Sequence, residues 1–198
     1  MTTVTHRGEQ TRRRILEVAA DLYAERGYEA TPLNEIIRAT GLTKGAVYFH
    51  FDSREHLAFE VYRREQEGWM DHVSAAVAGE GSALERLVEV GRSLAALIES
   101  RPRARCVGKI GEALASHPEL GSQVMAQLDA WIGLSEDLLR QAQEGGEVPT
   151  DLDTRLAAEV VVASFIGMEH VAEMRGGGLA RHVEGFVDLL LRAFGGRG

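Results

Sequence analysis

The chain is poor in the residues that build disulfides, metal clusters and membrane spans. Cys106 is the one cysteine among 198 residues, which excludes a disulfide within the chain and a cysteine metal cluster. Aromatic residues make up 6%, and no apolar run approaches the roughly 18 residues of a membrane-spanning helix. The start of the chain lacks the apolar segment of a signal peptide, and an amphipathic, acidic stretch follows Arg12-Arg13-Arg14, which argues against a twin-arginine signal. We therefore expect a cytoplasmic protein with no membrane contact.

The motifs of common enzymes are absent as well. The seven histidines include no His-Glu-x-x-His pattern, since Glu169-His170 lacks a second histidine four residues on. No Gly-x-Ser-x-Gly sequence occurs, because Gly91-Arg92-Ser93 lacks the closing glycine. The triple glycine at 176–178 follows an expected helix rather than a strand, which favours a linker over a nucleotide-binding loop. We expect no enzyme activity, no cofactor and no metal.

The charge is unevenly distributed along the chain. The net charge is −8, yet residues 1–56 hold eight Lys/Arg and eight Asp/Glu, and residues 57–198 hold fourteen and twenty-two. The excess of negative charge (22 − 14 = 8) therefore lies entirely in the second part. In the first fourteen residues four arginines accompany a single acidic residue, Glu9. This distribution is compatible with phosphate binding near the N-terminus.

Apolar residues recur at helical spacing throughout, and no window alternates as a strand does. Glycines, prolines and capping residues divide the chain into about nine helices. We predict an all-α fold with a three-helix domain at 1–52 and a separate helical bundle at 53–198. The predicted helices cover 9–26, 32–39, 43–50, 53–77, 82–98, 102–117, 118–144, 149–174 and 179–194.

Residues 31–51 predict two helices joined by a tight turn. Thr31 can cap the first helix, and Pro32 suits its first position, where a missing N–H costs nothing. Gly41 can take the left-handed conformation that ends a helix. Thr43 can then cap a second, very short helix. A helix, a glycine-containing turn and a helix form the helix-turn-helix motif, whose second helix enters the major groove of DNA.

The first sixty residues resemble the TetR family of transcriptional repressors. The resemblance rests on Arg14–Tyr23, on Gly27–Thr31 and above all on Gly41–Phe51, which matches the turn and recognition helix of that family nearly position by position. The sequence Thr-Lys-Gly-Ala-Val-Tyr-Phe-His-Phe and the acidic turn after it are similar to those of γ-butyrolactone receptors. Trp131 resembles the tryptophan that those receptors place over the ligand pocket.

The resemblance implies roles for residues of the helix-turn-helix. Lys44 is expected to contact guanine or a phosphate, and the small Gly45 and Ala46 to allow close approach to the groove. Tyr48 and His50 either face phosphates or close the core of the domain, and both alternatives stay open. Val47, Phe49 and Phe51 are expected to pack, and Arg12–Arg14 either reach the DNA backbone or are merely solvated. The candidate DNA-binding residues are Thr31, Thr43, Lys44, Gly45, Ala46, Tyr48 and His50.

The C-terminal part offers candidates for an effector site. Trp131 either forms a pocket wall or belongs to the core, and each of its companions on its own is as easily explained by packing. Cys106, flanked by Arg103, Arg105 and Lys109, could instead be a redox-sensing thiol, since cations lower the pKa of a thiol. The candidate effector-binding residues are Cys106, Ile110, Met125, Leu128, Trp131, Phe165 and Met168.

The last two predicted helices are unusually rich in apolar residues. The stretch 160–168 is apolar nearly all round, so it must be covered on more than one side. It is either one central helix buried in the chain or half of a four-helix interface in a homodimer. Together these features predict a homodimeric repressor that binds a pseudo-palindromic double-stranded DNA operator and is released by a small apolar effector. A redox regulator acting through Cys106 and an interaction protein that does not bind DNA are the alternatives.

Overall fold

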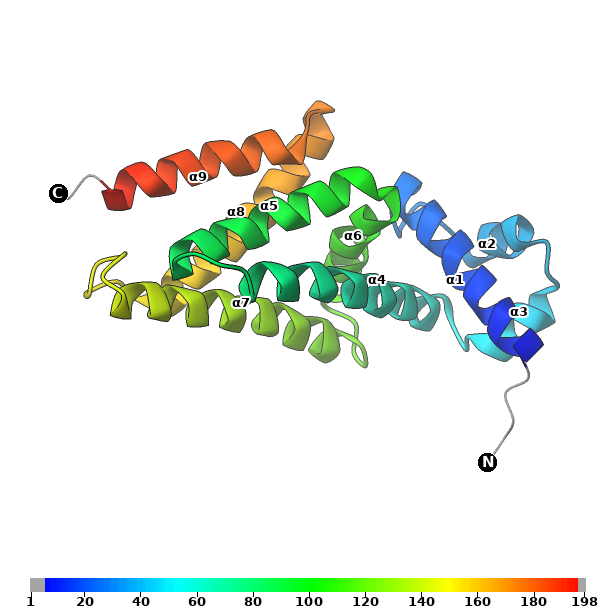
Figure 1. Cartoon of the computed structure of the whole chain (residues 1–198). Helices are drawn as coiled ribbons and strands as arrows, with labels where there is room; N and C mark the ends of the chain where they lie inside the picture. The colour runs from blue at the N-terminus through cyan, green and yellow to red at the C-terminus, as the bar shows by residue number, and fades with distance from the viewer. Residues whose placement is uncertain (1–5, 196–198) are drawn as a thin grey trace. The chain divides into compact units, whose positions relative to one another are not determined.

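The computed structural model describes residues 6–195, and within them every regular element is a helix (Figure 1). The prediction of an all-α fold with about nine helices is confirmed for this part of the chain. No helix of the described residues combines the length and the apolar character needed to cross a membrane. The elements are α1 (His6–Arg26), α2 (Leu33–Thr40), α3 (Lys44–His50), α4 (Arg54–Val77), α5 (Ala83–Ser100), the 3₁₀ helix η1 (Pro102–Arg105), α6 (Cys106–Leu114), α7 (Gly121–Glu144), α8 (Thr154–Arg175) and α9 (Leu179–Gly195).

The chain divides into two compact units. The first contains residues 6–68 and 101–124, and the second contains 69–100 and 125–195. Helices α4 and α7 each contribute residues to both units. A functional boundary at residue 52 remains a prediction.

The first unit holds the helix-turn-helix, α2 and α3, against α1. Ile15 and Tyr23 of α1, Ile36 of α2 and Val47 of α3 are completely buried and share one core. Phe51, directly after α3, is also buried, as expected for the residue that fixes the end of the recognition helix. Short, weakly helical segments such as α3 depend on this packing, since isolated helices of that length are unstable in water.

The turn between α2 and α3 forms as the sequence predicts. Gly41 has φ 67°, and its N–H donates to the Arg38 carbonyl, which ends α2. The Thr43 hydroxyl accepts a hydrogen bond from the Ala46 N–H at 3.2 Å and caps α3. These two local interactions set the direction in which α3 leaves the turn.

The predicted start of α2 is wrong by one residue. The helix begins at Leu33, and Pro32 rather than Thr31 occupies the capping position, with no side-chain cap. Thr31 is completely buried, and its hydroxyl donates to the Gly27 carbonyl at 2.8 Å. The hydroxyl closes the α1–α2 loop and leaves the N-terminus of α2 without a side-chain acceptor.

Two later helix starts follow the predicted capping residues. Of the alternatives Asp52 and Ser53, the Ser53 hydroxyl accepts from the His56 N–H at 3.1 Å, so serine caps α4. At α5 the Ser82 hydroxyl accepts from the Glu85 N–H at 3.2 Å, and the Glu85 carboxylate accepts from the Ser82 N–H at 2.8 Å. This reciprocal pair is a capping box.

Three proline-based starts are wrong. Pro102 opens η1, and the α-helix begins only at Cys106. Helix α7 begins at Gly121 rather than at Pro118, because the intervening turn is held by the His117 ring, which accepts from two following N–H groups at 3.3 Å. Helix α8 begins at Thr154, where Asp153 accepts from the Leu156 N–H at 3.0 Å. Side-chain acceptors, not prolines, set the starts of α7 and α8, whereas α6 has no side-chain cap.

The second unit is built on α5, which is buried along much of one face and packs against α9. The carboxylate of Glu147, far along the chain, accepts from the N–H groups of Ala83 and Leu84 at 3.1 and 3.0 Å. These bonds satisfy two of the free N–H groups in the first turn of α5.

Helix α8 is poorly covered within the chain. Among its described residues Ala158 and Ala172 are buried, whereas Leu156, Val160, Ile166, Val171 and Met174 are exposed. The interpretation of α8 as a buried central helix is therefore wrong.

Candidate nucleic-acid interface and effector site

The outer face of α3 carries exposed side chains of mixed chemistry. Lys44, Gly45, Tyr48 and Phe49 are exposed, whereas Val47 points into the core. Because residues four apart share a helix face, Val47 and Phe51 hold the inner side and leave the opposite side free. The exposed face of α3 therefore combines a cation, two aromatic rings and a glycine, where no side chain covers the backbone.

The prediction that Phe49 packs in the core is wrong. Its side chain is 85% exposed, and its closest aromatic neighbour is the His50 ring, edge-on at 5.2 Å between centroids. The spacing contained this information, since Phe49 lies two residues from both buried Val47 and buried Phe51 and so faces away from them. Phe49 is the residue of this surface that the sequence-based assignment missed.

Lys44 and Tyr48 form a unit on this face. The Lys44 ammonium lies 5.5 Å from the centroid of the Tyr48 ring, within the range of a cation–π interaction. Tyr48 is 42% exposed, so its ring is not a core residue. The arrangement keeps the lysine beside the ring and leaves the phenol hydroxyl near solvent.

Gly45 and Ala46 differ in surroundings. A Cβ added at Gly45 would meet no atom within 4 Å, so nothing in the protein requires glycine there. Glycine inside a helix costs about 0.5–1 kcal/mol relative to alanine. The open space above Gly45 fits a position that a ligand backbone approaches closely, whereas Ala46 is half-buried.

His50 lies at the border between surface and core. Its partial burial and the positive charge of Arg12 lower the pKa of the imidazole. The ring is therefore predominantly neutral at neutral pH. A phosphate beside it would favour the protonated form, so contact with an anion would be coupled to proton uptake.

Of the three consecutive arginines of α1, the first two form ion pairs within the chain and the third lies beside the helix-turn-helix. The Arg12 guanidinium pairs with Glu60 and lies 5.1 Å from the centroid of the Phe51 ring. Arg13 pairs with Glu17 at 2.8 Å. Arg14 is exposed, and its guanidinium lies 3.9 Å from where a side chain at Gly41 would begin, so it borders the helix-turn-helix.

Of the seven candidate DNA-binding residues, Thr31 is the one whose position is unsuitable. Both its hydroxyl and its N–H are bonded inside the chain, and it has no exposed surface. Thr43, by contrast, is exposed at the N-terminus of α3.

The candidate effector residues separate between the two units. Cys106 and Ile110 of α6 lie in the first unit and are completely buried. Met125, Leu128 and Trp131 of α7 and Phe165 and Met168 of α8 lie in the second unit, and each keeps some solvent exposure.

The redox interpretation of Cys106 fails. Burial, followed by the negative charge of Glu65, raises the pKa of the thiol well above its usual range, and the nearby Lys109 does not offset this. A buried neutral thiol is a poor nucleophile. Cys106 therefore acts as a small apolar core residue.

Trp131 does not stand alone on α7. Its ring meets the Trp69 ring of α4 in a tilted, edge-on contact with the centroids 6.2 Å apart. Trp69 is 7% exposed, and its indole Nε1 is buried with no hydrogen-bond partner in the described structure. Trp131 is half-buried, as is Leu128 one turn before it on the same face of α7.

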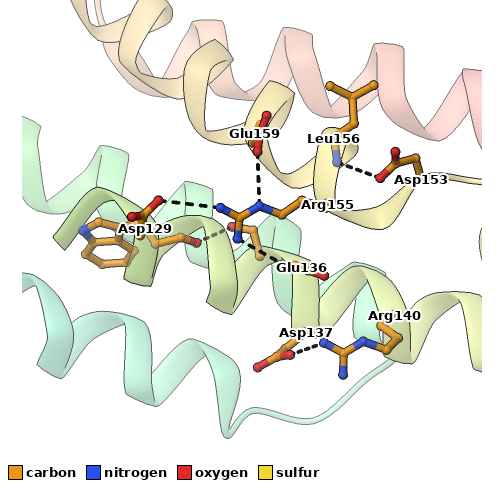
Figure 2. Close-up of polar contacts among 10 residues, drawn as sticks. Asp129, Glu136, Asp137, Arg140, Asp153, Arg155, Leu156 and Glu159 are labelled. Carbon is orange, nitrogen blue, oxygen red and sulfur yellow. Dashed lines mark hydrogen bonds and ion pairs between the residues drawn. The ribbon is translucent and has the colours of Figure 1, made fainter. Parts of the chain in front are cut away.

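Figure 2 shows how α8 is attached to α7 next to these residues. Arg155 of α8 pairs with Asp129 at 3.6 Å and Glu136 at 3.5 Å, both on α7, and with Glu159 one turn along its own helix at 3.1 Å. Each pair is exposed and adds little stability by itself. The two pairs with α7 place the first turn of α8 beside the α7 segment that carries Trp131.

A separate surface groove of about 500 Å³ lies between α4 and α5. It contains none of the candidate effector residues. Its lining consists of His72, Glu89, Arg92, Ser93, Ala96, Leu97 and Ser100.

A helix-turn-helix with an exposed recognition face, followed by a helical unit with a partly open aromatic wall, defines a DNA-binding regulator. The model of the bacterial regulatory proteins of the tetR family matches residues 15–61, and that of the tetracyclin repressor-like C-terminal domain matches residues 77–172. The chain belongs to the TetR family of transcriptional regulators.

The relatives include receptors for bacterial signalling molecules. The A-factor receptor protein of Streptomyces griseus is 33% identical over 176 residues, which cover 86% of this chain and 58% of that protein. The tetR regulator TylP of Streptomyces fradiae is 32% identical, with a TM-score of 0.68 over 94% of this chain and 87% of that one. A solved γ-butyrolactone receptor, an ArpA-like protein, is 29% identical, with a TM-score of 0.74 over 94% and 88%. The resemblance to this branch of the family is confirmed.

Proposed function

We propose that the protein is a transcriptional repressor that binds a pseudo-palindromic operator as a homodimer and is released by a small, largely apolar effector of the γ-butyrolactone type. The observation that carries the proposal is the outer face of α3, where a capped and well-packed helix exposes Lys44, Tyr48 and Phe49. An enzyme or a purely structural protein has no evident use for such a face.

In this proposal α3 enters the major groove. Lys44 donates to guanine or a phosphate, Gly45 and Ala46 allow the helix backbone to approach the bases, and Phe49 contacts thymine methyl groups. Tyr48, His50, Thr43 and Arg14 bind phosphates and fix the position of the helix. Thr31 is removed from the predicted set because of its burial.

The exposed apolar residues of α8 and α9 support the homodimer. The two helices pack on each other, and α9 adds exposed Leu189 and Leu191 to the exposed residues of α8. Exposed apolar side chains that gather on two adjacent helices are typical of a protein interface. A twofold dimer would present two copies of α3 to two half-sites about one helical turn of DNA, or a multiple of it, apart.

Trp131 with Met125, Leu128, Phe165 and Met168 is the proposed effector site, in the second unit. The names of the A-factor receptor and of the γ-butyrolactone receptor support a lactone as effector. Release requires that the effector binds the DNA-free form more tightly than the DNA-bound form, and by linkage operator DNA must weaken effector binding to the same extent. Helix α4, with residues in both units, is the proposed route of this coupling.

The test begins with an operator selected from random DNA duplexes by the purified protein. Fluorescence anisotropy then measures the affinity of wild type, of Lys44→Ala and of Arg140→Ala, a control that also removes one exposed cation, but from α7. We expect Lys44→Ala to weaken binding about tenfold and to lower the salt dependence by about one ion, and Arg140→Ala to change neither. An acyl-γ-butyrolactone should release the wild-type complex.

Equal affinity and equal salt dependence for wild type and Lys44→Ala would contradict the repressor proposal. That outcome would favour an interaction protein that has kept the fold without binding DNA.

A further inference from the structure

The Trp69 indole N–H is a buried donor that nothing in the described structure satisfies. The side chain is 7% exposed, and Nε1 is inaccessible and without an acceptor. Buried polar groups in folded proteins are nearly always hydrogen-bonded, so such a group needs an explanation. Phenylalanine would fill similar apolar space without an unsatisfied donor.

The position of this donor suggests the explanation. The Trp69 ring contacts the Trp131 ring at 6.2 Å, and Trp131 is the central residue of the proposed effector site. Trp131 and Leu128, on the same face of α7, are only half-buried, so a ligand that displaces these two side chains would reach the indole. A buried donor next to a partly open apolar wall is the composition of small-molecule sites, where a few polar groups fix the orientation of a largely apolar ligand.

We infer that Trp69 selects the effector: its Nε1–H donates to an acceptor oxygen of the ligand, while the apolar part of the ligand lies against Trp131 and Leu128. This inference rests on the proposed function and adds to it the polar requirement of the site. An indole nitrogen is a donor only, so a ligand that offers only N–H donors or a cationic centre leaves the bond unmade. A carbonyl oxygen, as in a lactone, or a carboxylate oxygen satisfies it.

Three probes of similar length separate these possibilities. γ-Dodecalactone has a carbonyl acceptor, octylcyclopentane has a ring and chain of the same size without any acceptor, and dodecanoic acid offers a carboxylate. Calorimetry measures the binding of each probe to wild type, to Trp69→Phe, which removes the donor and keeps an aromatic ring, and to the control Trp131→Phe, which keeps the donor.

We expect Trp69→Phe to bind the lactone about five- to tenfold less tightly than wild type, the range for one neutral hydrogen bond, and to bind octylcyclopentane as tightly as wild type does. Trp131→Phe should weaken the lactone and octylcyclopentane by the same factor, because both probes lose the same apolar contact. Unchanged operator affinity of both variants shows that they are folded.

The two tryptophans of the chain also provide a direct readout. A ¹H–¹⁵N spectrum contains two indole signals, which the two variants assign. The Trp69 indole proton should move downfield when the lactone is added and should not do so with octylcyclopentane, which offers no acceptor.

The outcomes distinguish this inference from the proposed function. If Trp69→Phe leaves lactone affinity unchanged, or weakens octylcyclopentane as much as the lactone, the role of Trp69 is wrong, while operator release by the lactone keeps the repressor proposal intact. If dodecanoate binds through Trp69 and the lactone does not, the inference stands and the lactone part of the proposed function falls. If no probe binds, the inference and the effector part of the proposed function are both overturned, and operator binding still tests the DNA-binding part.

Discussion

Helix α3 and the helices α8 and α9 all expose large apolar side chains, but the residues that surround these side chains differ. On α3 the exposed Phe49 stands among Lys44, Gly45 and Tyr48 on a helix whose inner side is buried. On α8 and α9 the exposed residues are aliphatic, and α8 buries almost none of its described side chains within the chain. Two aromatic rings among polar groups suit the mixed surface of a DNA groove, whereas exposed aliphatic residues suit the similar surface of a second copy. The same exposure therefore indicates two different partners.

The largest effect is expected from a charge placed among the exposed apolar residues of α9. Leu189 is 66% exposed, and Leu189→Glu would bury an unpaired carboxylate in each half of a twofold interface. We expect dissociation to monomers and operator binding reduced at least about 100-fold, measured by light scattering and anisotropy. Met70→Glu, at an exposed apolar position on α4, is the control and should stay dimeric. A dimeric Leu189→Glu protein would remove the distinction between the two surfaces.

A smaller effect is expected from the recognition face. Phe49→Ala should weaken operator binding roughly tenfold through lost contact with bases and leave the dimer intact, since the side chain contributes almost nothing to the core. Its salt dependence should equal that of wild type, because no charge is removed. Thermal stability changed by several degrees with operator affinity preserved would show that Phe49 acts in folding instead.

A third prediction contrasts the cap of α3 with the cap of α5. Thr43 caps α3 from the adjacent position, whereas Glu147 caps α5 from 64 residues away along the chain. Glu147→Ala should lower the free energy of unfolding by about 1–2 kcal/mol, as loss of a cap does. Glu144→Ala, at an exposed neighbouring position, should have little effect. Equal stability of both variants would mean that the long-range cap adds nothing.

The pH dependence of this effect has a definite sign. Partial burial raises the pKa of Glu147, but hydrogen bonds from Ser82, Leu84 and Ala83 outweigh it, so the folded pKa is below the reference value of 4.5. As the pH falls, Glu147 is protonated in the unfolded chain before it is protonated in the folded protein. The stabilisation is therefore complete above about pH 4.5 and is lost as the pH falls through the folded pKa. Denaturant unfolding of wild type and Glu147→Ala should therefore converge in acid.

The smallest effect is expected at Gly45. Gly45→Ala should stabilise the fold by about 0.5–1 kcal/mol, because the position is helical and nothing obstructs a methyl group. The same methyl group should weaken operator binding severalfold if the backbone approaches DNA there. Gly68→Ala on α4, where an added Cβ also meets open space, is the matched control and should stabilise without affecting DNA. Equal DNA affinity for both variants would remove Gly45 from the interface.

The sequence predicts most where interactions are local. The turn at Gly41, the cap at Thr43 and the packing of Phe51 depend on neighbours within a few residues, and all three are confirmed. The helix starts predicted at Thr31 and Pro118 are wrong. The Thr31 hydroxyl donates to the Gly27 carbonyl instead of capping α2, and the His117 ring holds the turn that follows Pro118. Phe49 was predictable from helical spacing.

The surroundings of the candidate effector residues were less accessible to sequence reasoning. Cys106 carries flanking cations that suggest a reactive thiol, but its accessibility and pKa depend on burial by distant segments, which no local pattern records. The unsatisfied donor of Trp69 likewise becomes evident only when all possible acceptors are placed in space. Long-range packing decides both.

The burial of Cys106 has a practical consequence for studying this molecule. A thiol that is sealed in the core and held neutral should not react with maleimide or nitroxide reagents in the folded protein. A cysteine introduced at an exposed position such as Arg38 would then be the single labelled site on each copy. In a homodimer two identical spin labels would report their mutual separation directly. The native chain thus serves as its own background without a reactive cysteine for measuring how far apart the two helix-turn-helix motifs of the proposed homodimer move when a candidate effector is added.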